Sequence, residues 1–304
     1  MKVAIVGAGA MGSLFGVLLK EAGHDVWLLY RKKEKMAIAH EHGITVEYKG
    51  QRRNIMLKTA FHYEQIGLSD LTIIFVKSHQ TEAVAKTAVA IAGSKGVVLT
   101  LQNGLGNVEK LTKHMDQNRI IAGTTTHGAT MLGIGHIRHS GSGITIIGNW
   151  KNDNMEVVKS IANEFTEAKI PCQTVEHIRP VIWEKLLVNV GINAITALTG
   201  IRNGQLLDMA VTRELSQLAV EEAVAVAQAK GITVRKDIID HVFKVATSTA
   251  SNRSSMGQDV DYHRFTEIDA INGMVVEIGK QLSIPTPANQ TLAALVETLQ
   301  EHYN

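Results

Sequence analysis

Short apolar runs alternate with helix-like segments through the first half of the chain. The runs are rich in β-branched residues and lie at 2–6, 26–30, 71–76, 97–101 and 120–124. Such alternation is typical of a parallel β-sheet built from βαβ units. The pattern therefore predicts a doubly wound α/β domain.

Two further pairs of short runs predict antiparallel strands. Residues 44–49 and 55–59 flank a polar stretch, and residues 135–140 and 143–147 flank a Gly-Ser pair. Runs separated by a few turn residues are typical of β-hairpins. We expect one hairpin from each pair, so that the first domain is mixed at its edge.

After Pro180 the pattern changes to apolar residues three or four apart, as at Leu215 and Leu218. This spacing is typical of amphipathic helices. We predict an α/β domain over residues 1–178 and a helical domain over residues 179–304.

The first apolar run ends in a turn with the spacing G-x-G-x-x-G. The turn comprises Gly7, Ala8, Gly9, Ala10, Met11 and Gly12. Gly7 permits a tight turn, Gly9 lets a pyrophosphate approach the backbone, and Gly12 lets the following helix pack closely on the strand. The helix N-terminus adds unpaired N–H groups and the positive end of the helix dipole. The motif predicts dinucleotide binding.

The second run is followed by Arg31, Lys32 and Lys33. An NAD-preferring site would carry a carboxylate there, about twenty residues after the glycines. Arg31 can instead hold a 2′-phosphate with its planar fork of donors, so we predict NADPH rather than NADH. The alternative is that residues 31–35, Arg31 included, form only a solvated basic turn.

Two polar residues follow later strands at the edge where doubly wound sheets bind ligands. Lys77 follows the run at 71–76, and Asn103 follows the run at 97–101. We expect Lys77 to contact the cofactor. Asn103 can donate and accept, which suits both cofactor and substrate, although Asn-Gly is also a common turn.

Lys185, Asn189 and Asn193 lie four residues apart in an apolar helical segment. This spacing places them along one side of a helix, where they could line a polar substrate pocket. A lysine in a partly dry cleft has a lowered pKa and can protonate a carbonyl oxygen as hydride arrives. We predict Lys185 as the general acid; the alternative is a surface lysine paired with Glu184 or another acid.

Two polar stretches interrupt the helical half, around Ser254 and Ser255 and around Glu267. The serines could bind a carboxylate through hydroxyl and backbone N–H groups, and Glu267 could accept a hydrogen bond from a hydroxyl. The alternatives are a helix cap for the serines and a surface salt bridge for Glu267.

Composition excludes several classes of protein. The 304 residues are 45% apolar and carry a net charge of +2, which is too small to hold a nucleic acid or an acidic membrane. Cys172 is the single cysteine, and the first strand starts too early for a signal peptide. Later apolar stretches are broken before the roughly 18 residues of a membrane-spanning helix. Thirteen histidines are scattered without metal-ligand spacing. We expect a cytoplasmic protein without a metal site.

Together these motifs resemble the ketopantoate reductase (2-dehydropantoate 2-reductase) family nearly end to end. The motifs that carry the resemblance are the glycine turn, Gln102-Asn103-Gly104-x-Gly106, Gly123-Thr124-Thr125-Thr126-His127, Trp183-x-Lys185-x-x-x-Asn189-x-x-x-Asn193, Ser254-Ser255-Met256-x-Gln258-Asp259 and Thr266-Glu267-Ile268-Asp269-x-Ile271-Asn272-Gly273. The lysine helix is also shared by enzymes similar to 6-phosphogluconate dehydrogenase.

The resemblance implies an N-terminal Rossmann domain and an all-helical C-terminal domain like that of 6-phosphogluconate dehydrogenase, with catalysis in the cleft between them. It implies reduction of 2-dehydropantoate to (R)-pantoate by NADPH, in pantothenate and coenzyme A biosynthesis. Lys185 would be the general acid. The implied substrate ligands are Asn103, Lys185, Asn189, Asn193, Asn203 and Ser255. The implied NADPH contacts are the six residues of the glycine turn, Arg31, Lys77, Asn103, Ala129 and Glu267. Glu267 would contact either NADPH or the substrate hydroxyl.

Two other functions stay open. The chain could reduce another branched 2-keto acid, because members of such families differ in substrate. It could also sense NADPH without catalysis, although a sensor needs no proton donor. The helical half carries enough small and apolar residues for a homodimer, but the same pattern lines ordinary domain interfaces.

Overall fold

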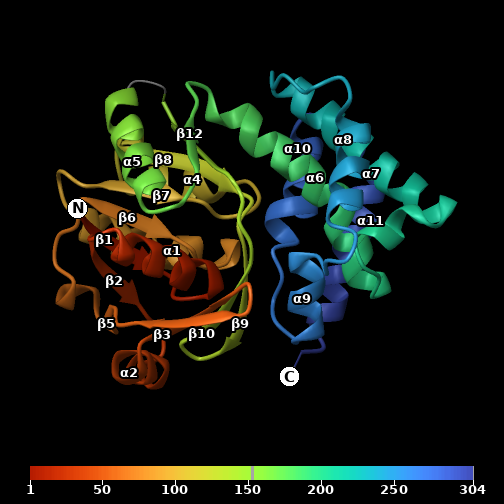
Figure 1. Cartoon of the computed structure of the whole chain (residues 1–304). Helices are drawn as coiled ribbons and strands as arrows, with labels where there is room; N and C mark the ends of the chain where they lie inside the picture. Colours follow the sequence, from red (N-terminus) through yellow and green to blue (C-terminus); the bar gives the residue numbers. More distant parts are fainter. Residues whose placement is uncertain (152–153, 304) are drawn as a thin grey trace. The chain divides into compact units, whose positions relative to one another are not determined.

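A computed structural model describes residues 1–151 and 154–303, and contacts divide these residues into two compact units (Figure 1). The first unit comprises Met1–Val76, Gln80–Gln102 and Asn107–Ile178. The second comprises the chain from Arg179 onward together with Lys77–His79 and Asn103–Gly106. Residues 77–79 and 103–106 thus interrupt the first unit in sequence, but they make their contacts with the second unit.

The first unit is built on an eight-stranded sheet in the order β12-β11-β8-β7-β6-β1-β2-β5. The strands are β1 (Lys2–Val6), β2 (Asp25–Leu29), β5 (Lys58–Ala60), β6 (Leu71–Ile74), β7 (Val97–Thr100), β8 (Ile120–Thr125), β11 (Thr145–Asn149) and β12 (Cys172–Thr174). All neighbours from β5 to β8 are parallel, and β11 runs antiparallel to β8. The chain order reverses between β1 and β6, which confirms the predicted Rossmann topology.

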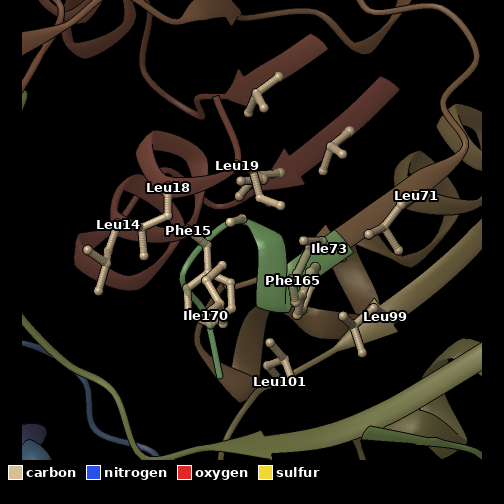
Figure 2. Packing of buried hydrophobic residues seen from close by; sticks show 14 of the residues in the cluster. Leu14, Phe15, Leu18, Leu19, Leu71, Ile73, Leu99, Leu101, Phe165 and Ile170 are labelled. Atoms are coloured by element: carbon tan, nitrogen blue, oxygen red, sulfur yellow. The ribbon is translucent and has the colours of Figure 1, made fainter. Parts of the chain in front are cut away.

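Helices cover both faces of this sheet. They are α1 (Ala10–Glu21), α2 (Lys33–His42), α3 (Thr81–Ala92), α4 (Asn107–Thr112) and α5 (Met155–Glu167). Phe15 of α1 meets Phe165 of α5 with the ring centroids 5.9 Å apart, and both side chains are fully buried (Figure 2). Figure 2 also shows Ile73 and Leu99, from β6 and β7, in the same core. The core thus holds α1, and with it the last residues of the glycine turn, on the sheet.

A second, four-stranded sheet has the order β4-β3-β10-β9, formed by β3 (Ile44–Tyr48), β4 (Gln51–Ile55), β9 (Gly128–Gly133) and β10 (His136–Gly141). The hairpin predicted after β2 exists, but its second strand is β4 and not 55–59. The turn is only Lys49-Gly50, with both residues at positive φ, as a two-residue hairpin turn requires. Residues 58–60 instead form β5 beside β2.

The predicted pairing of 135–140 with 143–147 is wrong. Strand β10 pairs with β9, which the apolar pattern did not reveal, and also runs parallel to β3. Strand β11 joins the large sheet beside β8. The Gly-Ser pair between β10 and β11 therefore connects two sheets and does not form a hairpin turn.

The second unit is helical, as predicted. Its helices are α6 (Ile178–Thr199, beginning at the unit boundary), α7 (Ala210–Ala229), α8 (Ile238–Ser248), α9 (Ser255–Asp261), α10 (Met274–Gln281) and α11 (Pro287–Gln300). A π-helical turn, Asp269–Gly273, precedes α10. Pro180 and Pro287 lie in first helical turns, where proline is tolerated. Leu218, counted among the apolar positions of α7, is 54% exposed.

Helix α6 is long and apolar enough to cross a membrane by length and composition alone, contrary to the expectation from the sequence. Its isolated polar residues do not lower the mean hydropathy sufficiently. However, 61% of its most apolar window is buried within the structure, as in the core helix of a globular unit.

Candidate active site

The glycine turn after β1 is packed too closely for side chains at two of its three glycines. Gly7 has φ +109°, and a Cβ there would lie 2.7 Å from the backbone nitrogen of Val76, which follows β6. A Cβ on Gly12 would lie 2.1 Å from the carbonyl oxygen of Gly7. A Cβ on Gly9 would meet nothing within 4 Å. Gly7 and Gly12 are therefore required by the fold, whereas the space at Gly9 is open for a ligand.

Helix α1 begins at this turn without a side-chain cap. Gly9 is the N-cap in an extended conformation, and no acidic residue lies in the first turn. Its carbonyl oxygen accepts the first helical hydrogen bond, from Ser13 N–H at 2.8 Å. The preceding N–H groups of the helix and its positive dipole end suit a phosphate. The six residues of the turn therefore fit the pyrophosphate of a dinucleotide.

The other predicted cofactor residues of the first unit lie on separate elements. Arg31 is exposed, two residues beyond the end of β2, and within residues 1–151 and 154–303 it forms no ion pair. Its guanidinium is thus available to an anionic ligand. Ala129 lies half-buried in β9, paired with His139 of β10. Among the described residues, no hydrogen bond or ion pair joins Arg31 to Ala129.

Glu267 is the centre of the polar cluster in the second unit. It is 7% exposed, and its carboxylate accepts hydrogen bonds from Asn103 Nδ2 at 3.0 Å and from the backbone N–H of Ser78 at 3.2 Å. The Lys77 ammonium lies 3.8 Å from the same carboxylate. The surface salt bridge considered for Glu267 is therefore wrong, because the residue is buried and is bound by two predicted site residues.

Lys77 also forms an ion pair with Asp259. Asp259 is 5% exposed, and burial raises the pKa of its carboxyl above the usual range while Lys77 lowers it. Arg264 Nε lies 3.7 Å from the other carboxylate oxygen. Asp259 was not assigned a role from the sequence. Asp259 lies four residues after Ser255 in the same polar motif, and this position could have indicated that it belongs to the site.

Lys185 lies half-buried on α6, one of three polar residues spaced four apart along the helix. Burial lowers the pKa of Lys185 to about 8, and the charge of Glu267 acts in the opposite direction. The neighbouring Glu184 accepts a hydrogen bond from Arg235 at 3.3 Å. A lysine with this pKa can give up a proton near neutral pH and can be recharged by solvent.

The asparagines predicted as substrate ligands include two buried side chains with unsatisfied polar atoms. Asn193 is 5% exposed, and its Nδ2 has no hydrogen-bond partner among the described residues. Asn203 donates from Nδ2 to Thr249 Oγ1 at 3.0 Å, while its Oδ1 is equally unsatisfied within the described chain. Asn189 is half-buried. Unsatisfied buried polar atoms are costly, and a polar ligand could pair with them.

The two adjacent serines have different roles. Ser254 is the N-cap of α9, and its hydroxyl oxygen accepts from Gly257 N–H at 3.0 Å and is joined to the Thr196 hydroxyl at 2.7 Å. The cap alternative is thus confirmed for Ser254. Ser255 is exposed.

Arg253 is a further residue that the sequence analysis missed. It forms a bidentate pair with Asp261, both hydrogen bonds being 2.9 Å, and donates to the carbonyl oxygens of Thr196 and Ile201. It therefore ties α9 to the end of α6. An arginine directly before two serines carries no distinct signal in sequence, because its partners lie far along the chain.

The structure brings together three predicted residues, Lys77, Asn103 and Glu267, through direct contacts, and the charge of Glu267 acts on the pKa of a fourth, Lys185. No group of three or more potential metal ligands occurs in residues 1–151 and 154–303. A Rossmann sheet with an open glycine turn, in a chain whose helical unit holds a lysine of lowered pKa, defines the architecture of a dinucleotide-dependent oxidoreductase.

The chain belongs to the ketopantoate reductase family. The family described as ketopantoate reductase PanE/ApbA matches residues 3–152, and its C-terminal domain matches residues 177–300. A 2-dehydropantoate 2-reductase from Halobacterium salinarum is 36% identical, with 99% of each chain covered.

Solved structures agree with this assignment. A PanE/ApbA family ketopantoate reductase from Ralstonia eutropha is 30% identical, with a TM-score of 0.91 and 99% of each chain covered. A ternary structure of D-mandelate dehydrogenase with NADH and anilino(oxo)acetate is 28% identical, with a TM-score of 0.95 and 100% of each chain covered. One fold therefore supports enzymes named for different substrates.

Proposed function

We propose that the chain is an NADPH-dependent 2-dehydropantoate 2-reductase that forms (R)-pantoate for pantothenate and coenzyme A biosynthesis in the cytoplasm. The single observation that carries this proposal is Lys185, a half-buried lysine of lowered pKa beside Glu267, in a chain of the ketopantoate reductase family. The family supports the substrate, and the lysine supports the chemistry.

The cofactor would be held by Gly7, Ala8, Gly9, Ala10, Met11, Gly12, Arg31, Lys77, Asn103, Ala129 and Glu267. When bound, the dihydronicotinamide supplies the hydride that a ketone needs. The open space at Gly9 and the uncapped start of α1 support the pyrophosphate position. The exposed Arg31 guanidinium supports the 2′-phosphate, and hence NADPH over NADH.

Lys185 acts on the substrate carbonyl at C2. Its ammonium donates a hydrogen bond to the carbonyl oxygen, stabilises the negative charge that develops there, and then transfers its proton from Nζ to that oxygen. The carbonyl thereby becomes a hydroxyl, and neutral Lys185 takes a proton from solvent. Glu267 keeps the protonated form of Lys185 populated, because its charge raises the lysine pKa against the effect of burial.

The substrate ligands proposed are Asn103, Asn189, Asn193, Asn203 and Ser255, with Lys185. The unsatisfied Nδ2 of Asn193 and Oδ1 of Asn203 support binding of a substrate that offers both acceptors and a hydroxyl donor. Such a substrate is a hydroxylated 2-keto acid. The proposal takes residues 1–178 as the cofactor domain and residues 179–304 as the substrate domain.

A specific observation favours a second candidate, the reduction of another 2-keto acid. The high structural similarity to D-mandelate dehydrogenase shows that the fold alone does not determine the substrate, and that protein was solved with NADH. A non-catalytic sensor is less well supported, because a sensor has no need of Lys185.

The test follows the absorbance of NADPH and of NADH at 340 nm with 2-dehydropantoate, pyruvate, 2-oxoisovalerate and phenylglyoxylate. We expect rapid oxidation only with NADPH and 2-dehydropantoate. Turnover of phenylglyoxylate or 2-oxoisovalerate, but not of 2-dehydropantoate, would show that the substrate is another 2-keto acid. A preference for NADH would contradict the proposed contact of Arg31 with the 2′-phosphate. Tight cofactor binding without any turnover would support the sensor.

A further inference from the structure

The segment that carries Asn103 rests directly on the π-helical turn that follows Glu267. The Leu105 backbone N–H donates to the carbonyl oxygen of Ala270 at 2.9 Å. Ala270 lies within the π-helical turn, whose Gly273 N–H bonds five residues back to Ile268 O at 2.9 Å. A π turn widens a helix and often marks a functional site. Here a carbonyl inside the turn accepts a hydrogen bond from another segment of the chain.

The residue between Asn103 and Leu105 allows this close approach. Gly104 has φ +81°, and a Cβ there would lie 2.4 Å from Ala270 O and 2.6 Å from Ala270 Cβ. Both distances are far below van der Waals contact, and the first involves backbone, which cannot rotate away. Only glycine permits the two backbones to touch at this point.

The contact joins Asn103 to Glu267, whose charge raises the pKa of Lys185 against the effect of burial. Asn103 directly precedes Gly104, and Glu267 lies three residues before Ala270, so each residue is next to one partner of the backbone contact. The Asn103 Nδ2 group donates a hydrogen bond to Glu267 Oε2 at 3.0 Å. Glu267 also accepts from Ser78 N–H. The positions of the Asn103 amide and the Glu267 carboxylate are thus set by one backbone contact as well as by their own hydrogen bond.

We propose that Gly104 is a positioning residue: its backbone, docked on Ala270 O of the π-helical turn, holds Asn103 and Glu267 as one preformed unit beside Lys185. This inference rests on the proposed function, since it concerns the same proton donor. Asn103 and Glu267 are then fixed before ligands bind and need no reorganisation during the reaction.

A neighbouring glycine provides a matched control. Gly106 has φ +82°, almost the same backbone conformation, but a Cβ there would meet only the Met274 side chain, at 3.6 Å. Gly104→Ala and Gly106→Ala therefore carry the same left-handed strain and differ in the close approach to Ala270. The comparison separates docking from strain.

The experiment measures kcat, KM and the pH profile of the wild type and both variants, with cofactor affinity measured separately by fluorescence titration. We expect Gly104→Ala to lower kcat/KM about 100-fold, as small displacements of catalytic groups do, and Gly106→Ala to lower it less than about threefold. We also expect the high-pH limit of kcat to move to lower pH in Gly104→Ala alone. A displaced Glu267 would stabilise the Lys185 cation less.

Leu105→Pro is a second variant, for use if Gly104→Ala does not fold. It removes the N–H that donates to Ala270 O, and it also fixes φ at this position and replaces the Leu105 side chain. It should change kcat/KM and the pH profile in the same direction. Equal losses in Gly104→Ala and Gly106→Ala, or a loss in Gly104→Ala without a shifted pH profile, would overturn the positioning role. A wild-type protein that is inactive on every keto acid would overturn both the proposed function and this inference. An active wild-type protein whose Gly104→Ala and Gly106→Ala variants lose kcat/KM equally would overturn only this inference.

Discussion

The candidate ligand sites of the two units are built from different parts of the chain. In the first unit the candidate cofactor site is made of backbone, through glycines at the end of β1 and the uncapped start of α1. In the second unit the candidate site is made of charged and amide side chains around the buried carboxylate of Glu267. A site made of backbone should lose binding when a glycine gains a side chain, and a site made of side chains should lose its function when a charged group is removed. This difference makes the two units separable by mutation.

The largest effect is expected from removing the proton donor of the second unit. Lys185→Ala should lower kcat by about 1000-fold, within the range for loss of a general acid, and should leave cofactor affinity in the first unit unchanged. Steady-state kinetics and a cofactor titration test this. Lys280→Ala, which removes an exposed lysine from α10, is the control. Lys185→Ala with most of its turnover intact would remove the lysine from the mechanism.

The wild-type pH profile sharpens the same prediction. Lys185 must be protonated to act, and its pKa in the free protein is about 8, so kcat/KM should fall as the pH rises through about 8. Glu267→Gln removes a charge that raises this pKa, and the fall should therefore begin at lower pH. A profile flat to pH 10 would contradict the assignment.

The first unit should respond to added atoms. Gly12→Ala places a Cβ 2.1 Å from Gly7 O and should lower the free energy of unfolding by about 1–3 kcal/mol. Gly9→Ala meets nothing within 4 Å, so it should leave thermal unfolding unchanged and weaken cofactor binding about tenfold or more. Calorimetry and titration separate the two outcomes. Undiminished cofactor affinity in Gly9→Ala would place the pyrophosphate elsewhere.

Arg31 is the one residue of the first unit that we expect to bind the cofactor through a charged side chain. Arg31→Ala should weaken NADPH binding about tenfold while leaving NADH binding nearly unchanged, because a charged hydrogen bond to the 2′-phosphate contributes about 1.5–3 kcal/mol. The ratio of the two dissociation constants is the measurement. Lys35→Ala, on the exposed side of α2, is the control. Equal losses for both cofactors would mean that Arg31 does not distinguish them.

A separate prediction concerns the stability of the first unit at low pH. His127 and His139 lie buried with ring nitrogens 3.4 Å apart, and burial lowers the pKa of His127 to about 4. The imidazole of His127 is protonated at about pH 6.5 in the unfolded chain but only at about pH 4 in the folded protein. The free energy of unfolding is therefore highest above pH 6.5 and decreases, by up to about 3 kcal/mol, as the pH falls toward 4.

Replacing the ring should remove part of this dependence. His127→Phe keeps the ring beside Phe15 and should flatten the decline in unfolding free energy between pH 6.5 and 4, measured by urea titration. His42→Gln, at an exposed position on α2, should leave it unchanged. An unaltered slope in His127→Phe would assign the acid sensitivity to other groups.

The sequence predicted those features that depend on neighbouring residues. The β1–turn–α1 unit and the lysine helix follow from spacings within about a dozen residues, and both are present. The pairing of β10 with β3 and the contact of Lys77 with Asp259 join segments far apart in the chain. Apolar alternation specifies which face of a strand is buried, but it carries no information on which strand lies beside it. The wrong hairpin between 135–140 and 143–147 has this cause.

The parallel contact between β3 and β10 also constrains how the chain is made. Strand β3 ends at Tyr48, and its neighbour β10 begins only at His136. During synthesis the β3–β4 hairpin emerges early and presents an unpaired edge until β10 leaves the ribosome. Unpaired edges invite association with other chains. Fragments that end before residue 136 should therefore aggregate, and the four-stranded sheet can be completed only after Gly141, nearly halfway along the 304 residues, has been synthesised.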